Sequence, residues 1–439
     1  MAQVTPTRPL NLTKHWGERY FQAGGPVDYQ AVAEGGATVL NMHQGNVINP
    51  WINYPYATNQ LMAEAADACH QFGMRFKIYN TMRELSNRCR EIWAMRSFHE
   101  TYVEGPAVQH DAADWLQEHL GGNFQKAWSN PMLTPFDKSA DLWWSQQQDA
   151  AIKVKALSRW NNFYVEGTRQ MQRDFNYDGI YLDEIAYDRV TIMRTKAVLG
   201  DAKLIDHHCD IGDMGGNSCA ANYMEMYPFI DTLWYGEGFN YDHASADYWL
   251  TEISGLALGL PSDMLRYAGM TPMHIKGLAH GSTNRWQAIS HAAGCTKNIS
   301  ASCDPFDPRD VWALQSSFGI SESVMIGWWV ELEEGREKLP VAVNVEDVKV
   351  TTYVRKGHSA LIVLANFGTA PVAVTLSFNW TLLGLNPAGS ILRAPALRVP
   401  PQKAQRWAGT PDAARLTVPA ATMGDPASLE GLILLLEAR

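Results

Sequence analysis

Carboxylic acids follow several short apolar runs of this sequence, at the positions where buried strands are expected to end. Asp183 and Glu184 follow "GIYL", and Glu237 follows "TLWYG". Asp206 and Asp263 hold similar positions, in "LIDHH" and "GLPSDML". In a parallel barrel the C-terminal ends of the strands meet at one mouth, where catalytic residues lie. We therefore predict that several of these acids converge at a single site.

Converging carboxyl groups among Trp and Tyr side chains are typical of enzymes that cleave glycosidic bonds. One carboxylic acid protonates the leaving oxygen, and a second carboxylate attacks, activates water or stabilises the cation-like transition state. The sequence also holds 16 tryptophans, whose flat faces suit the apolar faces of sugar rings. We therefore predict a glycoside hydrolase that acts on an oligo- or polysaccharide.

Two catalytic pairs fit these positions. In the first, Asp183 is the nucleophile and Glu237 the acid/base of a retaining mechanism, because strands ending in them can face each other across the mouth. In the second, Glu184 is the acid, and Asp183 orients a 2-acetamido group of the substrate that itself attacks. We predict the first pair and keep the second as the alternative. A catalytically inactive barrel that only binds carbohydrate is a further alternative.

Other polar and aromatic residues near the predicted strand ends are expected to bind sugar hydroxyls or to stack on sugar rings. Trp328 and Trp329 end the run "MIGWW", and alternation along a strand turns one of them towards the mouth. Lys77 has two interpretations, a ligand of an anionic sugar or an ion-pair partner of the acids, and we favour pairing. The predicted substrate-binding residues are His43, Asn46, Lys77, Arg83, Glu84, Tyr181, His207, Trp234, Asp263, Trp328 and Trp329.

The consecutive residues His207, His208, Cys209 and Asp210 suggest a metal site. Adjacent residues of a strand point to opposite faces, so no more than two of these side chains could share one ion. We therefore predict neither a metal ion nor another cofactor. A metal-dependent hydrolase that uses the histidines is the weakest alternative, and a chelator would reveal it.

The elements that must position these residues alternate between strands and helices. The predicted strands are the short apolar runs at 38–42, 74–80, 179–183, 203–206, 231–236, 256–260 and 324–328. With one further strand expected in the irregular segment 100–150, this alternation predicts an α/β fold of the (β/α)8 TIM barrel type. No Gly-rich phosphate loop follows the first strand, which argues against a doubly wound sheet.

The sequence pattern changes after residue 340. The stretch "VAVNVEDVKVTTYVRKGHSALIVLANF" alternates apolar and polar residues, which is typical of antiparallel strands. We therefore predict two domains. A catalytic barrel covers residues 1–340, with a long insertion around 100–150, and a C-terminal antiparallel β-sandwich covers residues 341–439.

Composition and charge exclude several classes of partner. The formal net charge of −10 argues against nucleic acid or an anionic membrane, since both need a concentrated basic face. No apolar run reaches the roughly 18 residues that span a bilayer. The first residues lack the apolar segment of a signal peptide, so we expect an extracytoplasmic protein if a leader has been removed and a cytoplasmic one otherwise. Carbohydrate is the expected partner, and no oligomeric state is predicted.

Six segments resemble those of a family of largely uncharacterised bacterial and invertebrate glycoside-hydrolase-like proteins, distantly related to glycoside hydrolase family 123. The segments are "NMHQGNVINPWINYPY", "IYNTMRELSNR", "WLQEHLGGN", "GIYLDEIAYDR", "LWYGEGFNYD" and "MIGWWVE". The resemblance covers most of the chain and implies a (β/α)8 barrel with a C-terminal β domain.

The resemblance also bears on the two catalytic pairs. Family 123 enzymes remove N-acetylgalactosamine by substrate-assisted catalysis through an adjacent Asp–Glu pair, which the resemblance places at Asp183 and Glu184. The segment around Glu237 is more similar to the acid/base strand of retaining α-galactosidase-like barrels. Sugar cleavage is therefore implied by both likenesses, and the choice between the pairs stays open.

Overall fold

The structure is a computed structural model whose described residues fall into two compact units. The described residues are 9, 11–51, 53, 55–81, 84–86, 89, 91, 101–103, 126–129, 148–154, 159–183, 188–209, 223–235, 245–264, 274–287, 307–331, 335–407, 411–422 and 428–438. The N-terminal unit consists of Tyr20–Cys209 and Tyr223–Thr232. The C-terminal unit consists of Met1–Arg19, Asp210–Asn222 and Leu233–Arg439. No helix among the described residues is long and apolar enough to cross a membrane.

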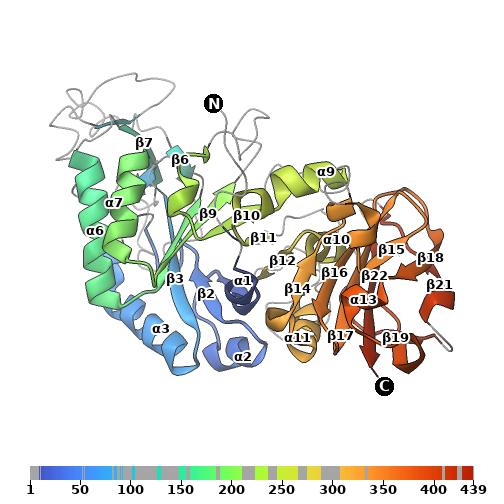
Figure 1. Cartoon of the computed structure of the whole chain (residues 1–439). Helices are drawn as coiled ribbons and strands as arrows, with labels where there is room; N and C mark the ends of the chain where they lie inside the picture. Colours follow the sequence, from blue (N-terminus) through green and yellow to red (C-terminus); the bar gives the residue numbers. More distant parts are fainter. Residues whose placement is uncertain are drawn as a thin grey trace. The chain divides into compact units, whose positions relative to one another are not determined.

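The N-terminal unit is built on parallel strands in the order β9-β8-β3-β2-β1. Figure 1 labels β2, β3 and β9 of this sheet. These strands are β1 (Tyr20–Ala23), β2 (Val39–Met42), β3 (Arg75–Asn80), β8 (Gly179–Asp183) and β9 (Leu204–Cys209). The helices of this unit are α2 (Tyr29–Glu34), α3 (Asn59–Gln71), α6 (Arg159–Phe175) and α7 (Arg189–Leu199). The predicted alternation of strands and helices is therefore confirmed here.

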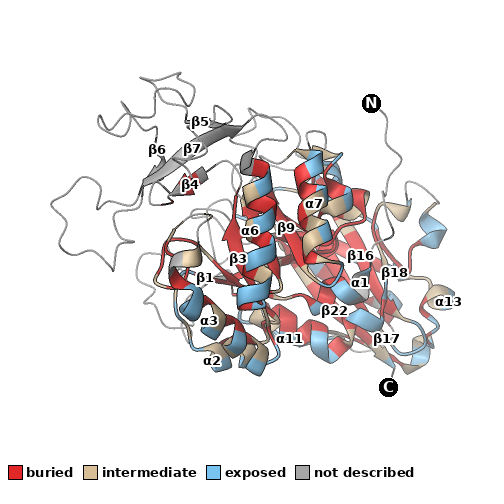
Figure 2. Cartoon of the chain, turned by 90° about the vertical axis from the view of Figure 1, so that its left-hand side faces the viewer, coloured by how far each residue is buried: buried red, intermediate tan, exposed pale blue. Residues whose placement is uncertain are grey.

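One face of this sheet is apolar and packs against helices. Phe76 and Ile78 of β3 alternate with Lys77 and Tyr79, and all four side chains are buried. Helix α3 packs on β3, and α6 packs on α7. Figure 2 shows the exposed outer sides of these helices, with buried strands behind them. The alternating polar residues must therefore occupy the other face of the sheet.

An aspartate before a strand fixes the N-terminal end of the sheet. Asp178 precedes β8, accepts hydrogen bonds from the Phe76 amide at 2.9 Å and from His70 Nε2 at 2.7 Å, and pairs with Lys203 at 3.0 Å. Burial would raise the pKa of Asp178, but these three donors together hold it below its ordinary value. Asp231 has the same role for β9, because its Oδ2 accepts a hydrogen bond from the amide of Ile205, the second residue of that strand. These two acids precede strands and have structural roles.

A small antiparallel sheet occupies part of the segment where a further barrel strand was predicted. Its strands are β4 (Glu84–Ser86), β5 (Thr101–Val103), β6 (Lys126–Ser129) and β7 (Gln148–Val154). The first three each pair antiparallel with β7. The prediction of a parallel strand within 100–150 is wrong for the described residues. A parallel strand outside the predicted set is β1, whose four residues "YFQA" are too few to show a pattern.

The C-terminal unit contains three parallel strands, β10 (Thr232–Tyr235, of which only Thr232 belongs to the N-terminal unit), β11 (Ser262–Met264) and β12 (Ser282–Asn284). The predicted strand at 256–260 is wrong, because Leu256–Leu258 form a 3₁₀ helix that ends at the left-handed Gly259, with φ 68°. An apolar run alone does not distinguish a buried helical turn from a strand. The strand begins later, at Ser262.

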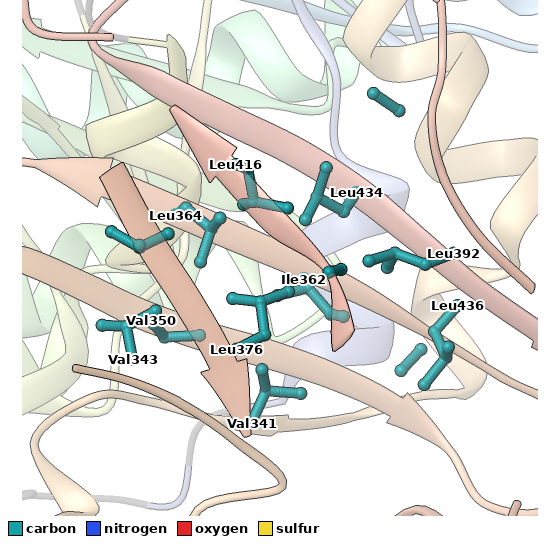
Figure 3. Packing of buried hydrophobic residues seen from close by; sticks show 14 of the residues in the cluster. Val341, Val343, Val350, Ile362, Leu364, Leu376, Leu392, Leu416, Leu434 and Leu436 are labelled. Carbon is teal, nitrogen blue, oxygen red and sulfur yellow. The ribbon is translucent and has the colours of Figure 1, made fainter. Parts of the chain in front are cut away.

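The C-terminal β domain consists of two antiparallel sheets, as predicted. The larger contains β14 (Val324–Ile326), β16 (Val348–Arg355), β17 (Ser359–Asn366), β22 (Gly431–Ala438), β19 (Ser390–Ala394) and β20 (Gln405–Arg406), in that order. The smaller contains β15 (Val341–Val343), β18 (Val372–Phe378) and β21 (Arg415–Val418). The two sheets bury one apolar core that includes Val341, Ile362, Leu376, Leu416 and Leu434 (Figure 3).

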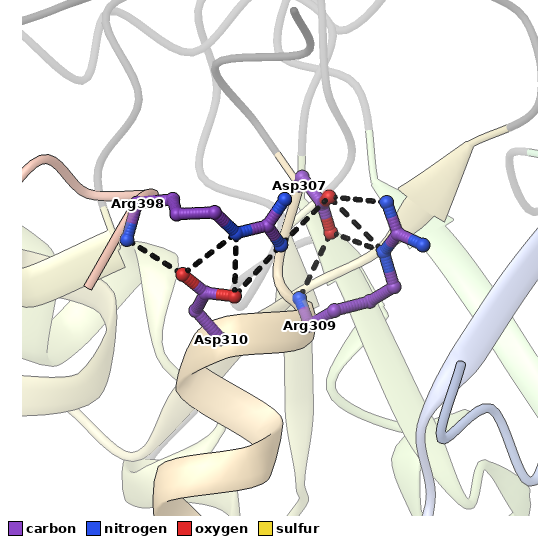
Figure 4. Close-up of polar contacts among 4 residues, drawn as sticks. All are labelled: Asp307, Arg309, Asp310 and Arg398. Atoms are coloured by element: carbon purple, nitrogen blue, oxygen red, sulfur yellow. Dashed lines mark hydrogen bonds and ion pairs between the residues drawn. The ribbon is translucent and has the colours of Figure 1, made fainter. Parts of the chain in front are cut away.

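The opposite face of the larger sheet is covered by helices of the same unit. Helices α10 (His274–Ala279) and α11 (Arg309–Phe318) share a second apolar core with the strands β16, β17 and β22. A charged cluster fastens α11 further, because Arg398 forms a paired contact with Asp310, and Arg309 forms one with Asp307 (Figure 4). Burial would raise the pKa of Asp310, but its bonds to Arg398 lower it. The β domain and these helices are therefore packed as one body.

Glu430 is a fully buried acid at the junction of α10 and the larger sheet. Its Oε1 accepts the Ile275 amide at 2.7 Å. Burial raises the pKa of Glu430 to about 7, and the Ile275 bond and the charge of Lys276 only partly oppose this rise. Between the ordinary pKa of 4.5 and a pKa of about 7, the folded state therefore holds a proton that the unfolded state has released. The free energy of unfolding must fall as pH rises through this window.

The variant Glu430→Gln should remove this loss of stability. Near pH 8 we expect it to exceed the wild type in free energy of unfolding by up to roughly 3 kcal/mol, and near pH 4 to equal it. Urea denaturation at both pH values measures the difference, and Glu346→Gln, at an exposed position, serves as the control. A variant as stable as the wild type at both pH values would contradict the expected protonation.

Candidate active site

Asp183 is the last residue of β8, and its carboxylate is fixed by the neighbouring strands on both sides. Tyr79 of β3 donates its hydroxyl to Oδ2 at 2.5 Å, and His208 of β9 lies with Nδ1 2.8 Å from Oδ1. Because a carboxylate only accepts hydrogen bonds, the His208 contact requires a proton on Nδ1. The side chain of Asp183 is 23% exposed and that of His208 is 1% exposed. The acid is therefore held by two donors while it remains open to solvent.

Strand alternation explains why these three side chains meet. Asp183 is directly opposite His208 in the parallel pairing, and Tyr79 is opposite Tyr181. Residues two apart along a strand share a face, so Tyr181 and Asp183 project to the same side. All four side chains therefore gather on the polar face of the sheet, near the C-terminal ends of its strands. This is the end at which barrel enzymes place their active sites.

Aromatic rings form a wall beside Asp183. The ring of Tyr79 lies 4.8 Å from that of His43 and 5.6 Å from that of Tyr181, which lies 6.1 Å from His208. His43 directly follows β2, and Asn46 shapes its loop by donating to the His43 carbonyl at 2.7 Å. The predicted residues His43 and Tyr181 are thus brought together with Asp183, and Asn46 supports His43 from the loop.

A buried ion pair lies on the same face of the sheet as Asp183. Lys77 of β3 pairs with Asp206 of β9, and both side chains are closed to solvent. Lys77 Nζ also lies 4.5 Å from the centre of the Tyr20 ring. Of the two interpretations of Lys77, its ion pairing is the one observed. Its burial leaves no surface for contact with a sugar.

His207 lies on the opposite face of β9 from Asp206 and His208. Its ring packs edge-on to Tyr223 at 5.0 Å and lies 6.4 Å from Tyr227. Burial, and then the neighbouring His208, lower the pKa of His207 well below its ordinary value, and Asp183 only partly opposes this. The structure does not bring His207 together with Asp183; its neighbour His208 makes that contact instead.

Trp234 and Asp263 lie together within the C-terminal unit. They are opposite each other in the pairing of β10 with β11. The guanidinium carbon of the buried Arg285 lies 3.1 Å from the centre of the Trp234 ring, and its Nε lies 3.2 Å from Asp263 Oδ2. Asp263 is therefore the counter-ion of a buried arginine that the sequence did not single out.

Trp328 and Trp329 do not end a barrel strand, and that prediction is wrong. The strand before them, β14, pairs antiparallel with β16 and belongs to the C-terminal β domain. Trp328 is 4% exposed and donates its indole N–H to His280 Nε2 at 3.0 Å. The Trp329 ring stacks 6.3 Å from His280. Burial lowers the pKa of His280 to about 4, so this histidine is a neutral acceptor at the centre of an aromatic cluster.

The remaining predicted residues are not described by the structure. Glu184 directly follows Asp183, and Glu237 is the second residue after β10; both lie outside the described residues, as does Arg83. Glu84 belongs to β4, and its side chain is likewise outside the description. Their roles stay predictions.

Comparison with known proteins identifies the fold around this site. The model of the glycoside hydrolase 123 TIM-barrel domain matches residues 11–287, and the model of the glycoside hydrolase 123 C-terminal domain matches residues 307–419. No curated protein sequence matches the chain significantly. The predicted (β/α)8 barrel is thus confirmed, with five parallel strands described in the N-terminal unit and three in the C-terminal unit.

Solved structures show the same fold at low sequence identity. The noncanonic maltogenic α-amylase AmyB from Thermotoga neapolitana is 11% identical with a TM-score of 0.54, covering 98% of this chain and 100% of its own. An α-amylase from Anoxybacillus is 9% identical with a TM-score of 0.56, covering 97% and 98%. An α-amylase from Geobacillus thermoleovorans is 9% identical with a TM-score of 0.54, covering 97% and 99%. These similarities show a shared fold and do not by themselves show a shared activity.

Proposed function

The chain belongs to glycoside hydrolase family 123, and we propose that it hydrolyses the glycosidic bond of a 2-acetamido sugar by substrate-assisted catalysis. Glycoside hydrolase activity and a carbohydrate substrate follow from the family. The proposal adds a mechanism and its residues. Asp183 orients the acetamido group and stabilises the charge that develops on it, and Glu184 protonates the leaving oxygen.

The observation that carries the proposal is that both oxygens of Asp183 accept hydrogen bonds from the protein. Donors on both sides fix the plane of the carboxylate. They also withdraw charge from both oxygens, which weakens either one as a nucleophile towards carbon. Each carboxylate oxygen has two lone pairs, either of which can accept a hydrogen bond. Asp183 is therefore better suited to accept an acetamido N–H than to attack the sugar.

The chemistry then proceeds in two balanced steps. The acetamido carbonyl oxygen attacks the anomeric carbon and closes a five-membered ring, while the bond to the leaving oxygen breaks and Glu184 gives that oxygen its proton. Positive charge develops on the ring nitrogen, whose N–H points to Asp183 and is stabilised by its negative charge. Water then opens the ring at the anomeric carbon, and Glu184 takes back a proton from it. The overall stereochemistry is retained.

Aryl glycosides test the proposal directly. A panel of α- and β-linked substrates, with either a 2-acetamido or a 2-hydroxyl group on the same sugar, isolates the contribution of the acetamido group. We expect turnover only of the 2-acetamido members, in one anomeric series. Comparable turnover of the matched 2-hydroxyl substrates would contradict the proposal and support the retaining pair of Asp183 and Glu237.

Tyr79→Phe removes one of the two donors to Asp183 found among the described residues and leaves the ring in place. A hydrogen bond to a charged group contributes about 1.5–3 kcal/mol, so we expect kcat/KM to fall by roughly 10- to 100-fold. Tyr164→Phe is the matched control, because the Tyr164 hydroxyl also donates a 2.5 Å bond, to Asn80 Oδ1. Steady-state kinetics on the preferred aryl substrate measure both variants. An equal loss in the two would show that the Tyr79 bond has only a structural role.

A further inference from the structure

The ring of His208 contacts Asp183 but cannot itself touch a substrate. We infer that His208 is a positioning residue, whose Nδ1–H fixes the carboxylate of Asp183 in the orientation that accepts the acetamido N–H. This inference rests on the proposed role of Asp183. It assigns the second donor of the site to a histidine that acts only through that carboxylate.

The geometry makes His208 a hydrogen-bond donor to Asp183. Nδ1 lies 2.8 Å from Asp183 Oδ1, and the side chain is 1% exposed. The other ring nitrogen, Nε2, is also buried and has no hydrogen-bond partner among the residues that the structure describes. A proton on Nε2 would therefore bury an unsatisfied donor and would set two lone pairs against each other at Nδ1 and Oδ1. The tautomer with its proton on Nδ1 is the one that this environment stabilises.

The neighbouring acid Asp206 does not compete with Asp183 for the hydrogen bond from His208. Asp206 is two residues earlier on the same face of β9 and is already paired with Lys77. Tyr79, from β3, donates to the other oxygen of Asp183. The two donors therefore act on different oxygens, and losing either one would free the carboxylate to rotate.

His207 provides a matched control for His208. Both are buried histidines of β9, at 0% and 1% exposure, but they lie on opposite faces. We expect His208→Ala to lower kcat by roughly 10- to 100-fold, the range for losing a hydrogen bond to a charged group. His207→Ala should lower the free energy of unfolding about as much as His208→Ala does. It should leave kcat within a few-fold of the wild type. His208→Asn should recover most of the lost activity, because the asparagine Nδ2 takes the place of the histidine Nδ1.

A double variant separates positioning from a general loss of structure. In an Asp183→Asn background, His208→Ala should cause no further loss of kcat, because both changes act on the same carboxylate. Multiplication of the two single effects would overturn the inference. So would an equal loss of kcat in His207→Ala and His208→Ala.

A readout that needs no substrate keeps the inference separate from the proposed function. In protein labelled with ¹⁵N-histidine, with the His208 signals assigned by their absence in His208→Asn, we expect the proton on Nδ1. A proton on Nε2 alone would overturn the inference even in an active enzyme. If the wild type cleaves no 2-acetamido substrate while His208 carries its proton on Nδ1, the proposed function fails and the assignment of His208 as a donor to Asp183 stands.

Discussion

Replacing Asp183 with asparagine should lower kcat/KM for a 2-acetamido aryl glycoside by roughly 10³-fold, the scale on which oriented charge stabilises a transition state. The amide keeps the shape of the carboxylate but carries no charge to stabilise the developing cation. Its single oxygen can satisfy only one of the donors Tyr79 and His208, and its NH₂ group must face the other. Both the charge and the orientation of the side chain are therefore lost.

A nearby acid with a structural role provides the control for this result. Asp188 caps α7 by accepting the Thr191 amide at 2.9 Å, five residues after Asp183. Asp188→Asn should lower the free energy of unfolding by about 1 kcal/mol or less and leave kcat/KM near the wild-type value. If Asp183→Asn kept more than a tenth of wild-type activity, Asp183 would not be the central residue of the site.

Replacing Glu184 with glutamine should have the second large effect, and it should depend on the leaving group. A general acid contributes about 10²- to 10⁴-fold, so hydrolysis of substrates with poor leaving groups should fall by that factor. Substrates whose leaving group needs no proton, such as dinitrophenyl glycosides, should be cleaved at nearly the wild-type rate. Glu237→Gln is the comparison, and we expect it to change either rate by only a few-fold.

The opposite pattern would identify the other catalytic pair. A loss in Glu237→Gln that depends on the leaving group, with little change in Glu184→Gln, would assign the acid/base role to Glu237. Asp183 would then be the nucleophile of a retaining mechanism. The two variants therefore separate the mechanisms that the sequence left open, while Asp183 is required by both.

The barrel could be predicted from those strands that are continuous apolar runs. Strand β8, "GIYLD", is buried through Leu182 and agrees with its predicted position, as does β10, "TLWY". The missed strands β1, β11 and β12 are short and carry polar side chains such as Gln22, Asp263 and Thr283. A sheet with one polar face interrupts the apolar runs on which strand prediction depends. The part of the barrel that holds the polar residues was therefore the hardest to predict.

The candidate site was predicted in part for the same reason. Asp183 could be identified because it is an acid at the end of a buried apolar strand. The sequence prediction names His207, but counting alternate residues from Asp206 places its neighbour His208 on the polar face. Tyr79 carried the same signal, two residues after Lys77. Arg285 follows a strand of only three residues, and no spacing in the sequence marks it.

The most direct test of the mechanism is the effect of fluorine on the acetamido group of the substrate. The measurement is kcat/KM for one aryl glycoside whose 2-acetamido group carries none, one, two or three fluorine atoms on its methyl carbon. Fluorine withdraws electrons from the carbonyl oxygen, so if that oxygen attacks the anomeric carbon, kcat/KM must fall with each added atom. A value of kcat/KM that does not change with fluorination would show that the acetamido group is not the nucleophile, and would contradict the role assigned to Asp183.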